Sequence, residues 1–400
     1  MYEDRLCHSR DAPLRLKATS EEITMNALLD TVDPDGLLEY SVVFTDRSLN
    51  HMSSSFRGVM TDISGMLKQV YNADAIAIIP GGGTFAMEAV ARQFGADAHA
   101  LVVRNGWFSY RWSQIFDAGK FTSETTVLKA RQTTNSPTAP FSPAPIDEVT
   151  AKIRATKPDV VFAPHVETSA GVILPDDYIT ALASAAHEVG ALMVLDCIAS
   201  GCVWVDMKAT GVDVLISAPQ KGWSASPCAG LVMMSDLAVT RLAETTSNSF
   251  AVDLKKWYQI MQAYENGGHA YHATMPTDAL RDFRDTMLET QTHGFEKLKT
   301  AQWHLGNSVR ALLHERGINS VAADGFGAPG VVVSYTDDPG IQNGSKFASE
   351  GMQIAAGVPL QCDEPQGFST FRLGLFGLDK LYNAERTIAS LQQVLNKVLS

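Results

Sequence analysis

Short apolar runs alternate with segments of helical period through the first two thirds of the chain. The run "AIAIIP" at 75–80, for example, precedes a segment of helical spacing that ends at Gly95. Strands that are apolar throughout and separated by helices are typical of a mainly parallel sheet with helices on both faces. The pattern therefore predicts an α/β fold. The apolar runs lie at 75–80, 99–104, 159–164, 191–196, 213–218 and 230–235.

The pattern changes near residue 288. A long segment of helical period begins there, and short strands such as "GVVVSY" and "FRLGLFG" and a final helix follow it. Because 400 residues exceed the usual size of a single core, we expect a second, smaller domain of α+β type. The expected division is an N-terminal segment at 1–44 that packs on the large domain, the large domain at 45–287 and the small domain at 288–400.

Composition and charge restrict the possible partners. Hydrophobic residues make up 45% of the chain and charged residues 19%, and the formal net charge is −12. Because no Lys/Arg cluster interrupts this acidity, we expect neither a nucleic-acid nor a membrane partner. The charged N-terminal sequence is unlike a secretory signal and no run of about 18 apolar residues occurs, so we expect a cytoplasmic protein. The five cysteines are scattered, which disfavours a disulfide framework or a zinc site.

Several polar and aromatic residues stand where the predicted strands end. Asp196 is the last residue of one strand, and Lys221 follows the next strand along the chain. Thr84, Phe108 and His165 fall at the same edge. Since ligands of parallel α/β sheets bind beyond the carboxyl ends of the strands, this edge is the expected ligand site.

The glycine-rich stretch "PGGGT" at 80–84 follows a strand and precedes a helix. It is either a simple turn or a cradle whose backbone N–H groups and helix N-terminus bind a phosphate. A dinucleotide site would need GxGxxG and an acidic residue about 20 positions later, at the end of the next strand. Here the spacing differs and the next strand ends at Arg104, so a nicotinamide dinucleotide is disfavoured.

Asp196 and Lys221 indicate a particular chemistry. An Asp at a strand end often only caps the following turn, but it can also pair with a protonated heterocyclic nitrogen. Lys221 lies at the end of the following strand, so both side chains are expected to face one crevice. A carboxylate beside a pyridine nitrogen and a lysine at an aldehyde form the arrangement that binds pyridoxal 5'-phosphate. We therefore predict that Lys221 forms a Schiff base with this cofactor.

Seven motifs occur along the chain in one order. They are "GGTFAME" (82–88), "NGWFSYRW" (105–112), "HVETSAG" (165–171), "LDCIAS" (195–200), "SAPQK" (217–221), "YHATMP" (271–276) and "FRLGLFG" (371–377). In this combination the chain resembles the class V aminotransferases of pyridoxal-phosphate fold type I, close to the alanine/serine–glyoxylate aminotransferase group. The resemblance covers roughly residues 45–400 and implies a seven-stranded type of sheet, a small C-terminal domain and no metal.

The resemblance implies roles for five residues around the cofactor. Lys221 is implied to be the Schiff-base lysine, and Asp196 to pair with the pyridine nitrogen; these two are the catalytic candidates. Gln220, Gly83 and Thr84 are implied to bind the phosphate.

The resemblance also implies contacts to the pyridine ring of the cofactor and to the substrate. Phe108 is implied to stack on the pyridine ring, with Trp107 as the runner-up. The hydroxyl of Thr168 or Ser169 falls where it would meet the ring or its phenolic oxygen. Arg372 is implied to bind the α-carboxylate of the substrate, for which a planar guanidinium is well suited.

Tyr271 and Thr274 are implied to reach the phosphate of the partner subunit. The expected assembly is therefore a homodimer with shared active sites. The expected reaction moves an amino group from a small amino acid of the alanine or serine type to a small 2-oxo acid, glyoxylate or pyruvate. Ping-pong kinetics are expected for this reaction.

Two stretches depart from the family. A Gly-Pro-rich loop usual near the N-terminus is absent, and Arg47, Asn50 and Arg57 there are candidates for the substrate pocket or for solvated and ion-paired positions. Further on, "QCDEPQG" replaces a segment that is commonly glycine-rich. Its Asp363 and Glu364 either meet a cationic substrate group or form a solvated acidic turn. The donor and the acceptor therefore stay open.

Three alternatives follow from these residues. A 2-aminoethylphosphonate or phosphoserine-type transaminase would need extra cations, which Arg47, Arg57 or Arg111 could supply. A fold type I lyase or cysteine desulfurase would use a mobile thiol such as Cys362, although Gln220 stands where a desulfurase carries His. An inactive member of the fold is disfavoured because the Lys, the Asp and the carboxylate-binding Arg are all present.

Overall fold

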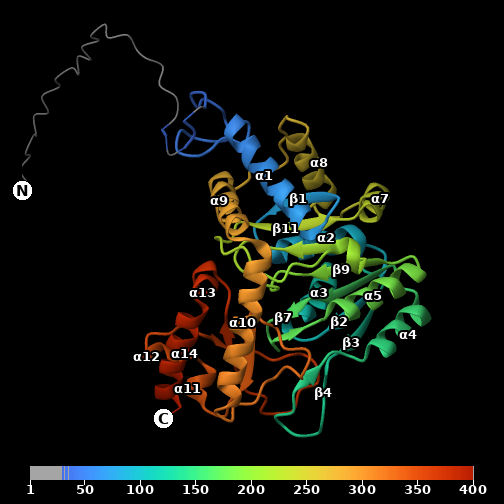
Figure 1. The fold of residues 1–400 in the computed structure, drawn as a ribbon. Helices are drawn as coiled ribbons and strands as arrows, with labels where there is room; N and C mark the ends of the chain where they lie inside the picture. Colours follow the sequence, from blue (N-terminus) through green and yellow to red (C-terminus); the bar gives the residue numbers. More distant parts are fainter. Residues whose placement is uncertain (1–28, 31, 35, 400) are drawn as a thin grey trace, which may run out of the picture.

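The computed structural model describes residues 29–399 apart from residues 31 and 35. Most of the expected N-terminal segment at 1–44 therefore lies outside the described residues. Figure 1 shows a large sheet with its helices, and a C-terminal group of helices and short strands at one end of it. Within the described part of the chain, no helix has the length and apolar character needed to cross a membrane.

The large sheet has seven strands in the order β1-β11-β10-β9-β6-β2-β3. Strand β11 (Ala229–Met234) is antiparallel to both of its neighbours, β1 (Ala75–Pro80) and β10 (Val214–Ser217). All other pairs are parallel, which confirms the predicted mainly parallel α/β sheet. The remaining strands are β9 (Leu192–Asp196), β6 (Val160–Pro164), β2 (His99–Arg104) and β3 (Glu124–Lys129).

Burial explains which strands the pattern detects. Each of the six predicted apolar runs coincides with one strand of the sheet to within one residue at either end, and β6, β9, β10 and β11 are buried at every position. The seventh strand, β3, lies at the edge and reads "ETTVLK", with two exposed residues at its start. An edge strand that keeps one side in water does not need a continuous apolar run, so the pattern misses it.

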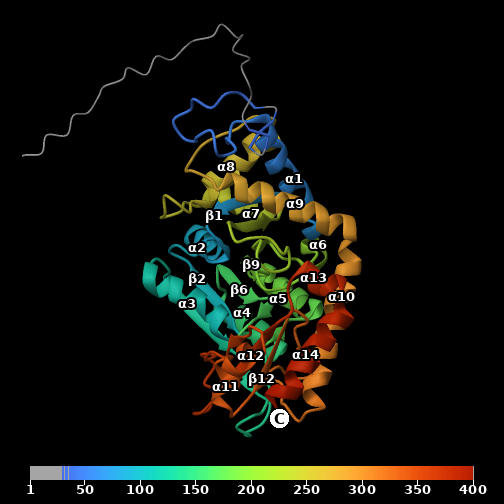
Figure 2. The same cartoon turned by 90° about the vertical axis from the view of Figure 1, so that its left-hand side faces the viewer.

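Helices cover both faces of this sheet and its β1 edge (Figures 1 and 2). Most of them begin directly after a strand, as the alternating pattern predicts. They are α1 (Ser54–Tyr71), α2 (Gly83–Phe94), α3 (Trp107–Gly119), α4 (Ile146–Thr156), α5 (Asp176–Glu188), α6 (Met207–Thr210), α7 (Asp236–Glu244), α8 (Leu254–Glu265) and α9 (Thr277–His293). Two short antiparallel pairs lie in the connections: β4 (Arg131–Gln132) with β5 (Phe141–Ser142), and β7 (Val166–Glu167) with β8 (Val172–Ile173).

The C-terminal elements form a second, antiparallel sheet of three strands in the order β12-β14-β13. Gly294, with φ at 100°, separates α9 from α10, so the division expected at residue 288 falls inside α9. We propose that the small domain begins near this glycine. Its elements are α10 (Phe295–His314), β12 (Val331–Tyr335), α11 (Pro339–Gln342), α12 (Ser345–Ser349), β13 (Ala355–Ala356), β14 (Thr370–Gly374), α13 (Leu378–Tyr382) and α14 (Ala384–Val398).

A buried aromatic cluster supports the chain just after Lys221. Trp223 is fully buried, and its ring centroid lies 4.7 Å from that of Trp204 and 6.1 Å from that of Phe283 on α9. Phe295 on α10 packs edge-on against both tryptophans. The cluster therefore joins the loop after β10 to the two long helices that lead into the C-terminal elements.

We expect Trp223→Ala to lower the free energy of unfolding by about 3–5 kcal/mol, the usual cost of emptying a buried aromatic site. Leu237→Ala is the control, because Leu237 is 46% exposed and its loss should cost less than about 1 kcal/mol. Urea unfolding of the cofactor-free proteins measures both values. Equal losses for the two variants would contradict the role given to this cluster.

Candidate active site

A cavity of about 300 Å³ opens at the carboxyl edge of the large sheet. Five separate segments of the chain reach it: the turn after β1, the start of α3, the loop after β6, the end of β9 and the loop after β10. The parallel strands are the reason, because their carboxyl ends share one edge. The predicted residues that line the cavity are Gly83, Thr84, Phe108, Thr168, Asp196, Gln220 and Lys221.

Asp196 is held at the edge by strand pairing. It is the last residue of β9, lies level with Pro164 of β6 and Ile216 of β10, and is only 7% exposed. Its Oδ1 accepts a hydrogen bond of 2.9 Å from the backbone N–H of Ile198. Burial raises the pKa of Asp196 to about 6, and the nearby Glu167 carboxylate adds to the rise.

Lys221 is half-buried in the same cavity. Burial lowers the pKa of its amino group, and the positive charges of Arg372 and Arg111 lower it further, while Asp196 acts in the opposite direction. The Nζ atom lies 5.1 Å from the centre of the Phe376 ring. A lowered pKa increases the fraction of neutral amine, which is the form that attacks a carbonyl carbon.

The two charged groups are not paired with each other. Among the described residues, neither Lys221 nor Asp196 has an oppositely charged side-chain group within 4.0 Å, although both line one cavity. A buried charge normally has a partner, so an unpaired amine and an unpaired carboxylate at one cavity fit a ligand that meets both. An aldehyde-bearing pyridinium has a group for each of them, and pyridoxal phosphate therefore fits this site.

The turn before α2 suits the phosphate of such a ligand. Gly82 precedes the helix, and no side chain of the described residues caps the first N–H groups of α2. A Cβ atom at Gly83 would come within 2.5 Å of the Ile198 side chain, which lines the same cavity. The glycines therefore keep the helix N-terminus open to an anion.

The start of helix α3 forms another part of the cavity wall. Phe108 stands in its first turn, and the guanidinium of Arg111 lies 5.2 Å from the centre of the Phe108 ring. Arg111 also donates a 2.9 Å hydrogen bond to Oγ1 of Thr84. Arg372 reaches the same ring from β14, at 5.8 Å, while its Nε–H donates to the carbonyl of Ala356. Two cations thus flank the aromatic ring of the cavity.

Comparison with known proteins shows the family. The sequence model of the class-V aminotransferases matches residues 32–318. The chain belongs to the class-V aminotransferases. Members of this family depend on pyridoxal phosphate, so the protein is a pyridoxal-phosphate-dependent transaminase of fold type I, as the motifs predict.

Relatives of this aminotransferase carry different names. A soluble hydrogenase small subunit from Synechococcus is 26% identical over 71% of both chains, and alanine–glyoxylate aminotransferase 1 from Saccharomyces cerevisiae is 24% identical over 78% of this chain and 82% of its own. The crystal structure of ureidoglycine–glyoxylate aminotransferase from Bacillus subtilis superposes with a TM-score of 0.72 at 21% identity and covers 90% of this chain and 89% of its own. That likeness shows the shared fold.

Three residues expected at the cofactor do not line this cavity. Ser169 is buried behind its wall, where its hydroxyl accepts from the backbone N–H of Trp107 and donates to Glu167. Tyr271 is 54% exposed, and its hydroxyl lies 3.1 Å from that of Thr274 on the outside of the chain. Thr168 thus stays the candidate for the ring contact, and Tyr271 and Thr274 do not reach this cavity in their own chain.

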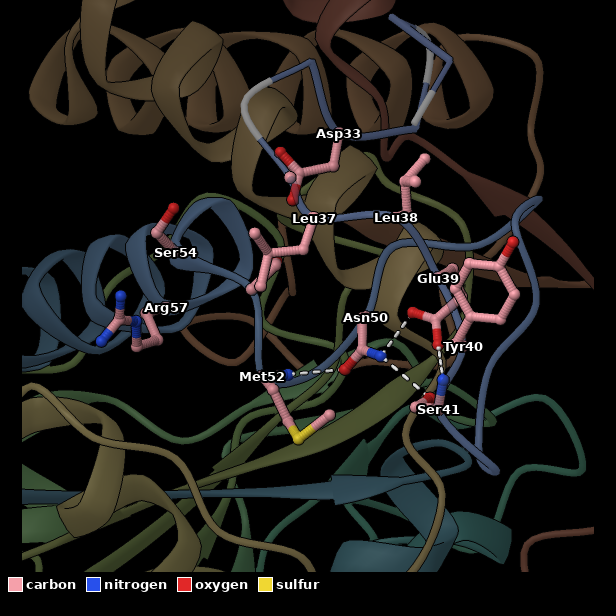
Figure 3. Close-up of a pocket in the computed structure, with 12 residues that line it drawn as sticks. Asp33, Leu37, Leu38, Glu39, Tyr40, Ser41, Asn50, Met52, Ser54 and Arg57 are labelled. Carbon is pink, nitrogen blue, oxygen red and sulfur yellow. Dashed lines mark hydrogen bonds between the residues drawn. The ribbon is translucent and has the colours of Figure 1, made fainter. Parts of the chain in front are cut away.

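The polar residues near the N-terminus lie elsewhere. Asn50 and Arg57 line a second cavity of about 480 Å³ between residues 33–41 and the start of α1 (Figure 3). In Figure 3 Asn50 points toward Glu39, to which its Nδ2 donates a 2.6 Å hydrogen bond. Arg47 is exposed and lines neither cavity. None of the three candidates therefore borders the cofactor cavity of its own chain.

The acidic stretch before Arg372 turns away from the cavity. Asp363 is exposed and forms a 2.7 Å ion pair with Lys129 at the end of β3. The Glu364 carboxylate accepts hydrogen bonds from three backbone N–H groups of its own loop, at residues 360–362. Both carboxylates therefore have structural partners, and neither lines the cofactor cavity.

Cys362 does not match the thiol that a desulfurase needs. It is buried, and its Sγ lies 3.4 Å from the backbone carbonyl of Arg104. Burial raises the pKa of the Cys362 thiol to about 12, so it carries almost no thiolate at neutral pH. The structure therefore disfavours the desulfurase alternative.

The carboxylate of Glu167 is a part of the site that the sequence did not reveal. Its motif, "HVETSAG", gave a role to the neighbouring hydroxyls and none to the acid. Glu167 is fully buried behind Phe108, and among the described residues the hydrogen bonds to its carboxylate come from α3 and from its own loop. The sequence did contain one signal of a buried acid, because Glu167 stands beside an apolar run and among small residues.

The raised pKa of Asp196 predicts a pH-dependent stability. The pKa of this carboxyl is about 6 in the folded protein, against 3.8 ordinarily. Its contribution to the free energy of unfolding is therefore fully present below pH 3.8 and is lost as the pH rises through 6. Asp196→Asn should therefore raise the free energy of unfolding of the cofactor-free protein above pH 7 by up to about 3 kcal/mol. Urea unfolding at pH 4.5 and 7.5 checks this: a gain that does not shrink at the lower pH would contradict it.

Proposed function

We propose that this aminotransferase moves an amino group from a small amino acid of the alanine or serine type to glyoxylate or pyruvate. The observation that carries the proposal is one small cavity lined by an amine, Lys221, and a carboxylate, Asp196, neither of which has an ion-pair partner among the described residues. The guanidinium of Arg372 lies 5.8 Å from the Phe108 ring at the wall of this cavity. A cavity of about 300 Å³ is at the lower end of ligand pockets and favours a small substrate beside the cofactor. The yeast relative named alanine–glyoxylate aminotransferase 1 supports the same choice.

Pyridoxal phosphate would be held at both of its ends. The N-terminus of α2, with Gly83 and Thr84, would bind the phosphate. Arg111 donates a hydrogen bond to Thr84 on this side, and Gln220 also lines the cavity. When bound, the cofactor supplies an aldehyde that condenses with amino groups and a ring that accepts electrons from the substrate's Cα. The Asp196 carboxylate would hold a proton on the pyridine nitrogen, since a buried carboxylate gains most from a cationic partner.

Lys221 would hold the cofactor's aldehyde carbon in the resting enzyme and move the Cα proton of the substrate during the reaction. Its lowered pKa suits this role, because a general base works best when its pKa lies near the working pH. Arg372 would bind the substrate α-carboxylate. Its Nε–H is already fixed by the carbonyl of Ala356, which leaves the outer nitrogens to form a two-point contact.

Arg111 favours a second candidate function. It lines the cavity as a second cation beside Lys221, while Arg372 does not line the cavity and lies 5.8 Å from the Phe108 ring. Among the described residues, the Arg111 guanidinium forms one hydrogen bond, to Thr84. A substrate with a second anionic group, such as a phosphonate or a phosphate, would find a partner there. The second candidate is therefore a 2-aminoethylphosphonate or phosphoserine-type transaminase.

We further propose a homodimer with shared active sites. Thr84, Phe85 and Gln220 border the cavity and are exposed, so the expected phosphate side is open in a single chain. Tyr271 and Thr274 are also exposed, and their hydroxyl pair does not line this cavity in their own chain. A second copy that places this pair over the open side would complete the phosphate site.

The visible absorption spectrum of the protein with pyridoxal phosphate tests the reaction. L-alanine or L-serine should bleach the band of the bound cofactor, and glyoxylate or pyruvate should restore it. Lys221→Ala is the control and should lower the rate of bleaching by about 10²–10⁴-fold, the contribution of a positioned general base.

Adding 2-aminoethylphosphonate and L-phosphoserine to the same experiment distinguishes the two candidate functions. Bleaching only by 2-aminoethylphosphonate or L-phosphoserine would favour the second candidate and assign Arg111 to the substrate. A band that none of these donors changes would contradict both proposals about the substrate.

Co-expression of two differently tagged chains tests the shared site. One chain carries Lys221→Ala and the other carries Tyr271→Ala with Thr274→Ala. A purified heterodimer should contain one intact site of two, and about half of the wild-type activity. Either homodimeric variant alone should be nearly inactive. A heterodimer no more active than the two homodimers would show that each site lies within one chain.

A further inference from the structure

The N-terminus of α3 is closed by a buried side chain from another segment. Glu167 is 0% exposed, and its Oε2 accepts a 2.9 Å hydrogen bond from the backbone N–H of Ser109 and a 2.7 Å bond from the Ser109 hydroxyl. Its Oε1 accepts from the backbone N–H of Phe108 at 3.2 Å. One carboxylate therefore binds two of the first backbone N–H groups of this helix.

Ser169 completes this anchor. Its backbone N–H and its hydroxyl both donate to Oε1 of Glu167, at 3.1 and 2.7 Å. The same hydroxyl accepts the backbone N–H of Trp107, the first residue of α3, at 2.9 Å. Three consecutive N–H groups, at residues 107–109, are thus satisfied from the loop that follows β6.

Gly106 permits the close approach. A Cβ atom there would lie 2.7 Å from Cγ of Glu167 and would collide with the Ser169 hydroxyl. The backbone of Gly106 is extended, so its lack of a side chain matters for space and not for conformation. The first turn of α3 can therefore sit directly on the carboxylate.

The two helix N-termini beside the cavity differ. Within the part of the chain that the structure describes, the first turn of α2 has no side-chain cap, whereas the first turn of α3 is capped by the Glu167 carboxylate. A helix N-terminus attracts an anion, and at α3 the Glu167 carboxylate already occupies this position. A phosphate is therefore directed to α2, and α3 is left to present the Phe108 ring.

We propose that Glu167 is a positioning residue: its buried carboxylate fixes the first turn of α3 and so sets where the Phe108 ring meets the cofactor. The proposal rests on the assignment of Phe108 as the stacking residue in the proposed function. Phe108 is bound to Glu167 through its own backbone N–H, so a shift of the carboxylate moves the ring directly. Glu167 itself does not line the cavity.

Glu167→Gln tests the proposal with the protein and pyridoxal phosphate. The amide keeps the shape but turns one oxygen into a donor, which then faces N–H and O–H groups that also donate. We expect the dissociation constant of pyridoxal phosphate to rise about tenfold, the usual effect of losing a hydrogen bond to a charged group. The visible circular dichroism per bound cofactor should change as well, because the aromatic ring beside the cofactor has moved.

Glu364→Gln is the matched control. Glu364 also accepts several backbone N–H bonds, from residues 360–362, but it does not line or support the cofactor cavity. Both variants should melt at a lower temperature than the wild type without cofactor. Only Glu167→Gln should weaken cofactor binding, and equal weakening in both would overturn the proposal.

A double-mutant cycle with Phe108→Leu shows whether Glu167 acts through the ring. If it does, Glu167→Gln should change the dissociation constant less than about twofold once the ring is absent. A second tenfold loss in that background would overturn the proposal. Ser169→Ala, a smaller change to the same anchor, repeats the cycle if Glu167→Gln does not fold.

The cofactor site and the positioning role of Glu167 can be refuted separately. A wild-type protein that does not bind pyridoxal phosphate would contradict the proposed site as a whole. Normal binding by the wild type together with unchanged binding by Glu167→Gln would overturn only the positioning role.

Discussion

The shared carboxyl edge of the parallel strands is the constraint on which the rest of the structure depends. Strand β9 is buried along its length and parallel to β6 and β10, so burial of its apolar residues also fixes where Asp196 emerges. Lys221 arrives at the same edge from the loop after β10. Packing of the sheet thus sets the positions of the two reactive groups before any ligand binds.

This arrangement has a cost in stability. Asp196 and Lys221 lie in or near the protein interior with no ion-pair partner in the part of the chain that the structure describes. Burial raises the pKa of Asp196 and lowers the pKa of Lys221, so it favours the neutral form of each group. Such groups destabilise a fold, and they persist where the surroundings determine their positions strongly. Here the aromatic cluster around Trp223 supports one side of the cavity, and the Glu167 anchor under α3 supports the other.

The hydrophobic pattern was sufficient for most of the large sheet because fully buried strands must be apolar on both faces. It failed at β3, whose edge position lets the chain keep polar residues. The site was harder to predict where two neighbouring residues were candidates for the same contact to the cofactor. Thr168 and Ser169 are neighbours with similar side chains, and only the hydrogen bonds of Ser169 to Trp107 and Glu167 show which hydroxyl faces away from the cavity.

By itself, the sequence determined the α/β class, the order of the strands along the chain and the residue types that gather at one edge, because these follow from local periodicity and from the rule for parallel sheets. Only the tertiary structure decided which of those residues meet. Contacts between different segments of the chain decide whether Asp363 faces a substrate or Lys129. Such contacts also decide whether Asn50 borders the cofactor or Glu39. Local spacing carries no information about such contacts, so the packed fold alone selects among them.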